Sequence, residues 1–159
     1  MDTRFLQRQP AAFAAALAAA LVCGLAGTSV LAGPRLAASA DREGASFAAC
    51  TGPVRVTCVV DGDTFWYRGT KIRIADINAP ELSKPGCERE ARLAAAATRR
   101  LTTLLNAGPF SLATEGREID RYGRALRVVM REGTSLGTVL EREGLAEHWQ
   151  GRRGDWCAV

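Results

Sequence analysis

The sequence predicts a small α+β domain that consists mainly of β-strands. Short segments rich in β-branched and aromatic residues occur before residue 80 and again after residue 109. Between them, residues 88–106 have the periodicity of one long helix, and residues 136–143 form a shorter helical segment. Three strands, a helix, two strands and a second helix fit a five-stranded barrel of the OB type with two helices.

The first 40 residues have the pattern of a signal peptide. Arg4 and Arg8 precede an almost unbroken apolar run over residues 11–22, and the small residues 38–40 supply the cleavage site that we favour. Together with the apolar residues that follow it, this run approaches the ~20 residues that span a bilayer, so a retained anchor is the alternative. We therefore expect a periplasmic or secreted protein, or one anchored in the inner membrane.

Removal of residues 1–40 changes the charge balance of the chain. The formal net charge of +4 falls to +2, because 18 basic and 16 acidic residues remain. The overall pI of about 9.0 is therefore weak evidence for nucleic-acid binding. Any such function has to rest on where the charged side chains lie.

Four cysteines remain after the leader: Cys50, Cys58, Cys87 and Cys157. An even number in a short exported domain indicates two disulfides, for which the sequence allows three pairings. We favour Cys50 with Cys58 and Cys87 with Cys157. A zinc site is the weaker alternative, since there is no CxxC pair and His148 is the single histidine of the sequence.

The first half of the domain is expected to be a β-meander. Residues 41–53 are mostly small and polar and are interpreted as a linker before the domain proper, 54–159. Turns are expected at Asp61-Gly62-Asp63 and at residues 68–70, and Pro80 ends the meander because it cannot donate to a sheet ladder. The strands lie between these breaks, at residues 55–60, 64–67 and 71–77.

The second half is expected to supply the helices and two further strands. Leucines and alanines recur at helical spacing over residues 88–106, and Gly108-Pro109 stops that helix. A charged loop joins strands at residues 110–114 and 125–130, and Ser135 is a suitable N-cap for the second helix. Trp149 is interpreted as part of the core, with a platform for base stacking as the alternative.

Several classes of enzyme are disfavoured. A single histidine argues against a serine–histidine–aspartate triad and against a multi-histidine metal site. The chain also has no P-loop and no dinucleotide-binding fingerprint. A general base, if there is one, should therefore be a carboxylate.

Polar residues concentrate between residues 61 and 81 and again at 120–124. Asp63, Asn78 and Glu81 supply hard oxygen atoms, and Arg73 and Arg124 supply guanidinium groups. Such a set suits a divalent cation beside a phosphate and could support hydrolysis of a phosphodiester. The alternative is that the aspartates only form a turn and that Arg124 is a solvated charge.

Four segments resemble the staphylococcal nuclease (thermonuclease) family in content, order and spacing. They are DGDT at 61–64, IRIADINAPE at 72–81, DRYGR at 120–124 and SLGTVLEREGLA at 135–146. The similarity covers roughly residues 54–149, and the family fold is an OB-type barrel. The family's archetype continues into another helix, where this chain has Trp156-Cys157, so we expect a disulfide to secure this end.

The resemblance implies roles for particular side chains. It implies that Arg73 and Arg124 grip the scissile phosphate and that Glu81 is the general base toward water. Tyr122 matches a tyrosine near the bound phosphate. The expected activity is hydrolysis of DNA or RNA with low sequence preference, leaving 3′-phosphate ends. We expect a monomer without a stable protein partner, and a membrane contact only if the leader is retained.

The resemblance also implies a calcium site made by Asp63, Asn78 and the backbone carbonyl of Ala79. The family has an aspartate where this chain has Asn78, so we expect weaker calcium binding because ligand charge contributes to affinity. Asp76 could share a face with Asn78 and lend charge, but a bend before Pro80 could equally turn it away. The alternatives to an enzyme are therefore a weakened, nuclease-like module that binds nucleic acid or protein, and a periplasmic domain with an unrelated ligand.

Overall fold

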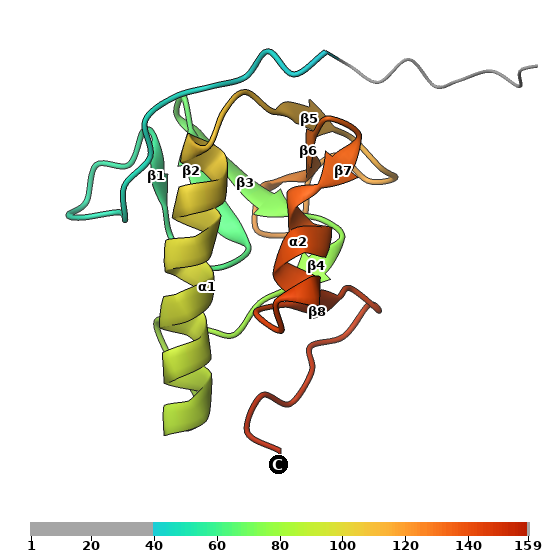
Figure 1. The fold of residues 1–159 in the computed structure, drawn as a ribbon. Coiled ribbons are helices and arrows are strands. Elements are labelled where there is room, and N and C mark those ends of the chain that lie inside the picture. The colour runs from blue at the N-terminus through green and yellow to red at the C-terminus, as the bar shows by residue number, and fades with distance from the viewer. Residues whose placement is uncertain (1–39, 159) are drawn as a thin grey trace, which may run out of the picture. The chain divides into compact units, whose positions relative to one another are not determined.

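The computed structural model describes residues 40–158, and the targeting segment predicted at residues 1–40 lies outside them apart from Ala40. Strands and two helices alternate as the sequence predicts, so the α+β fold class is confirmed (Figure 1). Within residues 40–158 neither helix has the length and apolar character needed to cross a bilayer. The elements in chain order are β1 (Cys58–Val59), β2 (Thr64–Tyr67), β3 (Thr70–Ile74), β4 (Ile77–Asn78), α1 (Glu88–Asn106), β5 (Ser111–Ala113), β6 (Ala125–Arg131), β7 (Thr134–Ser135), α2 (Leu136–Arg142) and β8 (Glu147–His148).

The main sheet has the strand order β1-β2-β3-β6-β5, and β7 pairs with β6 beside this path. The predicted meander is present, since β1, β2 and β3 are consecutive antiparallel neighbours. β3 then pairs with β6 in parallel, and β5 is antiparallel to β6. The parallel pair brings the end of β3 beside the start of β6, although more than 50 residues separate them along the chain.

Residues 43–50 are part of the fold, whereas the sequence suggested a linker over 41–53. Glu43 bridges to Phe110, which precedes β5, and Ala49 bridges to Val59 in β1. The segment thus connects the two edge strands of the main sheet. Phe47 is 4% exposed and packs on the rings of Phe65, Tyr67 and Phe110. One buried aromatic ring is the physical reason that a small, polar stretch is ordered here.

The element bounds differ from the sequence prediction mainly in the strands. The predicted strand 55–60 is reduced to β1, and the predicted strand 71–77 is divided into β3 and β4 by a bend at Ala75-Asp76. The long helix has the predicted bounds, and α2 is one residue shorter than predicted. β8 was not predicted, because two residues carry no periodicity; it pairs with β4 as a separate ribbon.

The core lies between α1 and the main sheet. α1 buries Ala94, Ala97, Leu101, Leu104 and Leu105 on one face, as the helical spacing of its apolar residues predicts. Cys87 is its N-cap, and Glu88 and Glu90 occupy the first turn, where the helix dipole favours negative charge.

Two disulfides attach segments to the elements of the fold. Cys50 bonds to Cys58 and Cys87 bonds to Cys157, so the favoured pairing is confirmed. The second bond ties the C-terminal segment to the N-terminal end of α1. Arg89 reinforces this attachment by donating to the carbonyl oxygens of Trp156 and Ala158 at 3.1 and 2.5 Å. Disulfides of this kind indicate an oxidising compartment.

Candidate nucleic-acid site

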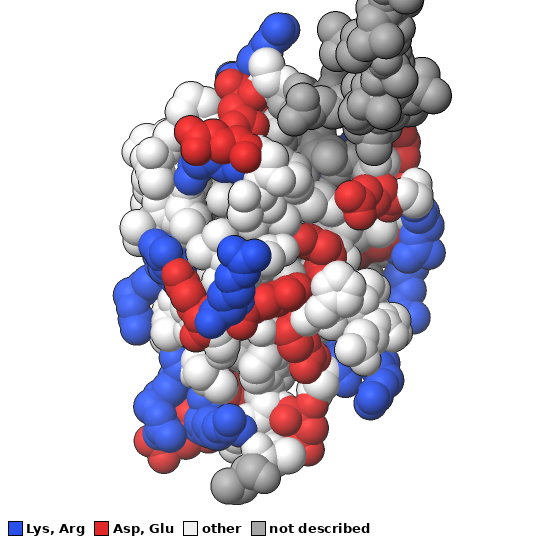
Figure 2. All heavy atoms as spheres, turned by 45° about the vertical axis from the view of Figure 1, so that its right-hand side comes forward, with Lys and Arg blue, Asp and Glu red and all other residues white. Residues whose placement is uncertain are grey.

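A cleft of about 840 Å³ opens where the parallel pair of strands meets the loop before β6 and the C-terminal segment. Its lining is rich in arginine, with two aromatic rings and two acidic side chains: Arg73, Arg117, Arg121, Arg124, Arg153, Tyr122, Trp149, Glu115 and Asp120. On the face shown in Figure 2, acidic and basic side chains are interspersed. The five arginines of the cleft outnumber its two acidic side chains, so the cleft offers positive charge to a phosphate backbone.

The turn before β2 is held by its own side chains and by tight packing. Asp61 Oδ1 accepts a hydrogen bond from the N–H of Asp63 at 3.1 Å. Gly62 is buried against α1: a Cβ atom there would lie 2.6 Å from Ala97 Cβ and 2.7 Å from Ala79 Cβ. Glycine is therefore needed here for close packing, and this packing brings the turn against the residues after β4.

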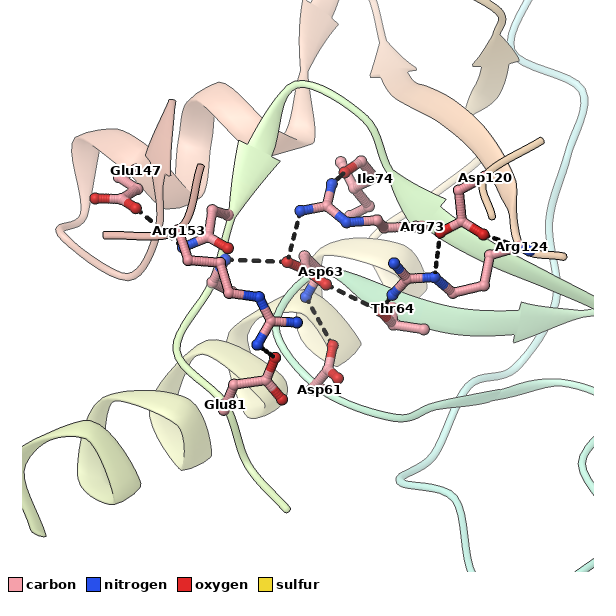
Figure 3. A network of polar contacts seen from close by, with 12 residues as sticks. Asp61, Asp63, Thr64, Arg73, Ile74, Glu81, Asp120, Arg124, Glu147 and Arg153 are labelled. Carbon is pink, nitrogen blue, oxygen red and sulfur yellow. Dashed lines mark hydrogen bonds and ion pairs between the residues drawn. The ribbon is translucent and has the colours of Figure 1, made fainter. Parts of the chain in front are cut away.

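Asp63 is 8% exposed, and both of its carboxylate oxygens have partners. Oδ1 accepts a hydrogen bond from the Thr64 hydroxyl at 2.9 Å. Oδ2 accepts from the N–H of Ala79 at 3.1 Å and lies 3.4 Å from Arg73 Nη2 (Figure 3). Asp63 thus joins the turn, the residues after β4 and one arginine of the cleft.

Arg73 is held in a single orientation on β3. It stands opposite Thr64 in the register of β2 and β3, and its Nη1 donates to the carbonyl oxygen of Ile74 at 2.6 Å. Its guanidinium carbon lies 4.7 Å from the ring centroid of Trp149, a cation–π arrangement. Trp149 is 36% exposed, and its ring lines the cleft beside Arg73. The preferred interpretation of Trp149 as a core residue is therefore wrong.

Arg124 is fixed by the loop that precedes β6. Asp120 accepts from Arg124 Nε at 2.7 Å and from the Arg124 N–H at 3.0 Å. Arg124 Nη1 also lies 3.5 Å from the Thr64 hydroxyl. Burial alone would raise the pKa of the Asp120 carboxyl, but hydrogen bonds from Arg124 and from the Tyr122 N–H bring this pKa below its ordinary value. The aspartate is therefore a stable anion that orients the arginine.

Tyr122 lies at the surface of the same loop. Its side chain is exposed, and its ring contacts the guanidinium groups of Arg121 and Arg124, whose carbon atoms lie 4.8 and 5.5 Å from the ring centroid. The ring therefore forms one wall of the cleft next to Arg124.

Asn78 is buried in β4, and its side chain is oriented by a residue of β8. Its Nδ2 donates to Glu147 Oε1 at 2.9 Å, across a register pair of the two strands. Asp76 points elsewhere, since its Oδ2 accepts from the Ser135 hydroxyl at 2.5 Å, at the start of α2. Asp76 therefore does not lend its charge to Asn78, and the carboxylate next to Asn78 is Glu147.

Glu81 follows Pro80 and is paired with an arginine of the C-terminal segment. Its Oε1 contacts Arg153 Nη1 in an ion pair (Figure 3). Its N–H donates to Glu90 Oε1 at 3.1 Å. About one third of the Glu81 side chain is exposed. The carboxylate is thus accessible from the solvent side, with Arg153 across it.

Asp61 completes a group of three carboxyl groups. Its burial, together with the negative charge of Asp63 and of Glu81, raises the pKa of Asp61 to about 7. Burial makes the largest contribution to this shift, and repulsion by the two neighbouring carboxylates adds to it. A cation in this region would relieve that repulsion.

The residues expected to hold calcium fit that ion moderately. Asp63, the amide of Asn78 and the carbonyl of Ala79 supply oxygen atoms, the ligand type that calcium prefers. Over residues 40–158, however, three or more acidic, histidine or cysteine side chains do not converge into a metal-binding group of their own. The oxygen donors and the repelled Asp61 carboxyl favour a hard cation, and the low ligand charge favours weak binding.

Arg73, Asn78, Glu81, Arg124 and Tyr122 were predicted from the sequence, whereas three side chains that contact members of this set were not. Asp120 holds Arg124, Glu147 holds Asn78, and Arg153 pairs with Glu81. The i,i+4 spacing of Asp120 and Arg124 is a signal that could have revealed the first. The other two depend on the pairing of β4 with β8 and on the path of the C-terminal segment, which no local pattern indicates.

Comparison with known proteins gives one positive finding. A family model for staphylococcal nuclease homologues matches residues 71–155, just over half of the chain. The match extends from β3 through the C-terminal segment and includes Arg73, Glu81, Arg124 and Arg153, whereas Asp63 precedes it. No curated protein matches the chain.

Proposed function

The chain belongs to the family of staphylococcal nuclease homologues, and on that premise we propose that it is an exported nuclease that hydrolyses phosphodiester bonds of DNA or RNA with calcium and with low sequence specificity. One observation carries this proposal above the others. Two guanidinium groups, those of Arg73 and Arg124, line one cleft and are each held by a buried carboxylate, with Thr64 between them.

This pair of arginines is suited to a phosphodiester under attack. Addition of water places extra negative charge on the phosphoryl oxygens, and fixed positive groups stabilise that charge without having to reorganise. Arg73 is held by Asp63 and by the Ile74 carbonyl, and Arg124 is held by Asp120. The two guanidinium groups are therefore already oriented before a substrate binds.

Glu81 is the candidate for the general base. Its side chain is partly exposed and stands on the turn that Asp63 anchors through the N–H of Ala79. In the proposed reaction, Glu81 takes a proton from the attacking water while Arg73 and Arg124 hold the phosphate. The Trp149 and Tyr122 rings of the cleft can stack on any base, which is consistent with low sequence preference.

Members of this family are typically calcium-dependent, and Asp63, Asn78 and the Ala79 carbonyl are the groups that would hold the ion here. Bound calcium would supply positive charge beside the phosphate. Because Asn78 brings no charge, we propose that calcium binds weakly. The two disulfides support a periplasmic or secreted location.

The test is digestion of denatured DNA by the protein with calcium and with a chelator. Glu81→Gln should lower the rate by about 10²- to 10⁴-fold, as expected for loss of a general base. Glu88→Gln is the matched control, because Glu88 is an exposed glutamate that pairs only with Arg92 on the helix surface. Activity that persists both in the chelator and in the Glu81→Gln variant would overturn the mechanism.

A second candidate function is a binding module that has lost efficient catalysis. Two observations favour it: an amide at Asn78, and the Arg153 guanidinium already paired with the presumed base. This function predicts tight binding of single-stranded DNA without hydrolysis in any divalent cation. Hydrolysis that depends on Glu81 would exclude it.

A further inference from the structure

Arg153 has a position that the family resemblance does not explain. It lies on the C-terminal segment, after β8, yet it lines the same cleft as Arg73 and Arg124 and also contacts Glu81. Resting on the function proposed above, we propose that Arg153 is a substrate-positioning residue that binds a backbone phosphate next to the scissile one and leaves Glu81 when it does so.

The position of Arg153 is built by contacts on both sides of it. Before it, the Trp149 N–H donates to the Asp76 carbonyl at 2.8 Å, and the Trp149 ring stacks with Arg73. After it, the Gly154 N–H donates to Glu147 Oε1 at 2.6 Å, and Cys157 is bonded to Cys87. The segment is thus anchored to the sheet, to β8 and to α1.

Glu147 connects this segment with the candidate metal-binding residues. The same oxygen, Oε1, accepts from Asn78 Nδ2 and from the Gly154 N–H. Gly154 packs so closely that any side chain there would overlap the Glu147 carboxylate. Arg153 therefore stands at a defined place relative to Asn78 and Glu81.

Among Arg73, Arg124 and Arg153, Arg153 has the most accessible N–H donors. The side chains of Arg73 and Arg124 are 10% and 18% exposed, and their guanidinium groups donate to carbonyl and carboxylate groups of the protein. The Arg153 side chain is 63% exposed, and among the residues that the structure describes its guanidinium group pairs with Glu81. A guanidinium group has five N–H donors in a fork that matches phosphate, so Arg153 can exchange the carboxylate for a phosphate oxygen.

The exchange of partners has a functional consequence. In the free protein the ion pair keeps the Glu81 carboxylate engaged. When a polynucleotide enters the cleft, its phosphate offers Arg153 a second anion and Glu81 becomes free to accept a proton from water. The geometry thus couples binding of an extended chain to release of the base, and it favours substrates with more than one phosphate.

The experiment measures equilibrium binding of a labelled single-stranded oligonucleotide to the full chain in a chelator, so that binding is separated from hydrolysis. Affinity is determined over a range of salt concentrations. Log affinity falls linearly with log salt concentration, and on a single strand each phosphate contact contributes about −0.7 to the slope. Loss of one contact therefore makes the slope shallower by about 0.7. Arg153→Ala should show this loss of about 0.7 and a fall in affinity of about tenfold at low salt.

Two further variants make the result specific. Arg152→Ala is the matched control, because it removes the same charge from the neighbouring position, which does not line the main cleft. It should leave the slope unchanged. Arg153→Lys should retain the slope and lose part of the affinity, since an ammonium group keeps the charge but not the fork.

Glu81→Gln should tighten oligonucleotide binding, because Arg153 no longer has to break its ion pair with the Glu81 carboxylate before it binds a phosphate. This gain in affinity should be absent when Arg153→Ala is combined with Glu81→Gln. An unchanged slope in Arg153→Ala, or equal loss in Arg152→Ala and Arg153→Ala, would overturn the inference. The proposed function is tested by a different result. If the variants show the expected salt slopes but the protein does not hydrolyse DNA in calcium, the proposed function is wrong and the role of Arg153 in binding stands. Conversely, hydrolysis with an unchanged slope in Arg153→Ala would reject the inference alone.

Discussion

Glu147 Oε1 accepts a hydrogen bond of 2.9 Å from Nδ2 of Asn78, a buried residue at the position where the sequence resemblance implies an aspartate. An acid and an amide are thus paired across β4 and β8. The amide nitrogen faces Glu147, so an aspartate at residue 78 would place two carboxylates at hydrogen-bond distance. The departure from the family pattern at Asn78 is therefore matched by the residue opposite.

Asn78→Asp alone should destabilise the protein in a chelator by about 1–3 kcal/mol, because one donor is lost and two anions face each other in a buried place. Glu147→Gln in the same chain should recover part of this loss, since its amide N–H can donate to the aspartate at residue 78. The recovery is incomplete because the Gly154 N–H then loses the oxygen atom that accepts from it. Chemical denaturation of the single and double variants measures both effects. Equal stability of Asn78→Asp and the wild type would contradict the importance of this pair.

The double variant, Asn78→Asp with Glu147→Gln, should also bind calcium more tightly than the wild type. It carries a charged ligand at residue 78 without the opposing carboxylate, and ligand charge raises calcium affinity. Titration calorimetry checks this directly. Glu147→Gln alone is the control and should not tighten calcium binding; if it tightens binding as much as the double variant, residue 78 is not a ligand.

Gly62→Ala should destabilise the fold by about 1–3 kcal/mol. A Cβ at residue 62 would overlap the Cβ atoms of Ala97 and Ala79, so the turn, the residues after β4 and α1 would have to separate. Thermal unfolding measures the loss. Gly44→Ala is the matched control, because no atom lies within 4 Å of a Cβ at that position. Comparable losses in both variants would contradict the close approach.

Asp120→Asn should lower stability in a way that depends on pH. The pKa of Asp120 is depressed in the folded protein, so its ionised form contributes stability above the ordinary carboxyl pKa of about 3.8. That contribution is lost as pH falls through the still lower pKa of the folded state. The difference in unfolding free energy between wild type and Asp120→Asn should be constant near neutral pH and shrink below about pH 4. A difference that grows in acid would contradict the assigned role of Arg124 as its partner.

Replacement of both Cys87 and Cys157 by serine should cost about 2–4 kcal/mol, because the bond closes a loop with a sequence separation of 70 residues. It should also weaken binding of single-stranded DNA in the same direction as Arg153→Ala, since the segment that carries Arg153 loses its attachment to α1. Denaturation and binding titrations measure the two effects. Removal of the Cys50–Cys58 bond is the control, because that bond closes a loop of separation 8 away from the cleft residues, and it should leave DNA binding unchanged.

Much of the fold could be predicted from the sequence because it depends on local patterns. The apolar spacing of α1 has a period of 3.6 residues over five turns, and its bounds were predicted correctly. Ser135 was predicted as an N-cap and accepts from the N–H groups of Gly137 and Thr138. The short strands were less well defined, since β1, β4 and β8 have two residues each and a period cannot be established over two residues.

By itself the sequence determined the fold class and the segments that carry Arg73, Glu81 and Arg124, whereas it allowed three disulfide pairings, of which the structure contains the one that we favoured. Only the tertiary structure decided which partners these side chains have. Phe47 packs the expected linker on the core, and Glu147 lies beside Asn78 because β8 pairs with β4. Arg153 lies beside Glu81 in a segment that the Cys87–Cys157 disulfide attaches to the start of α1. Local patterns report periodicity and turn chemistry, whereas ion pairs between segments some 70 residues apart depend on how the whole chain is packed.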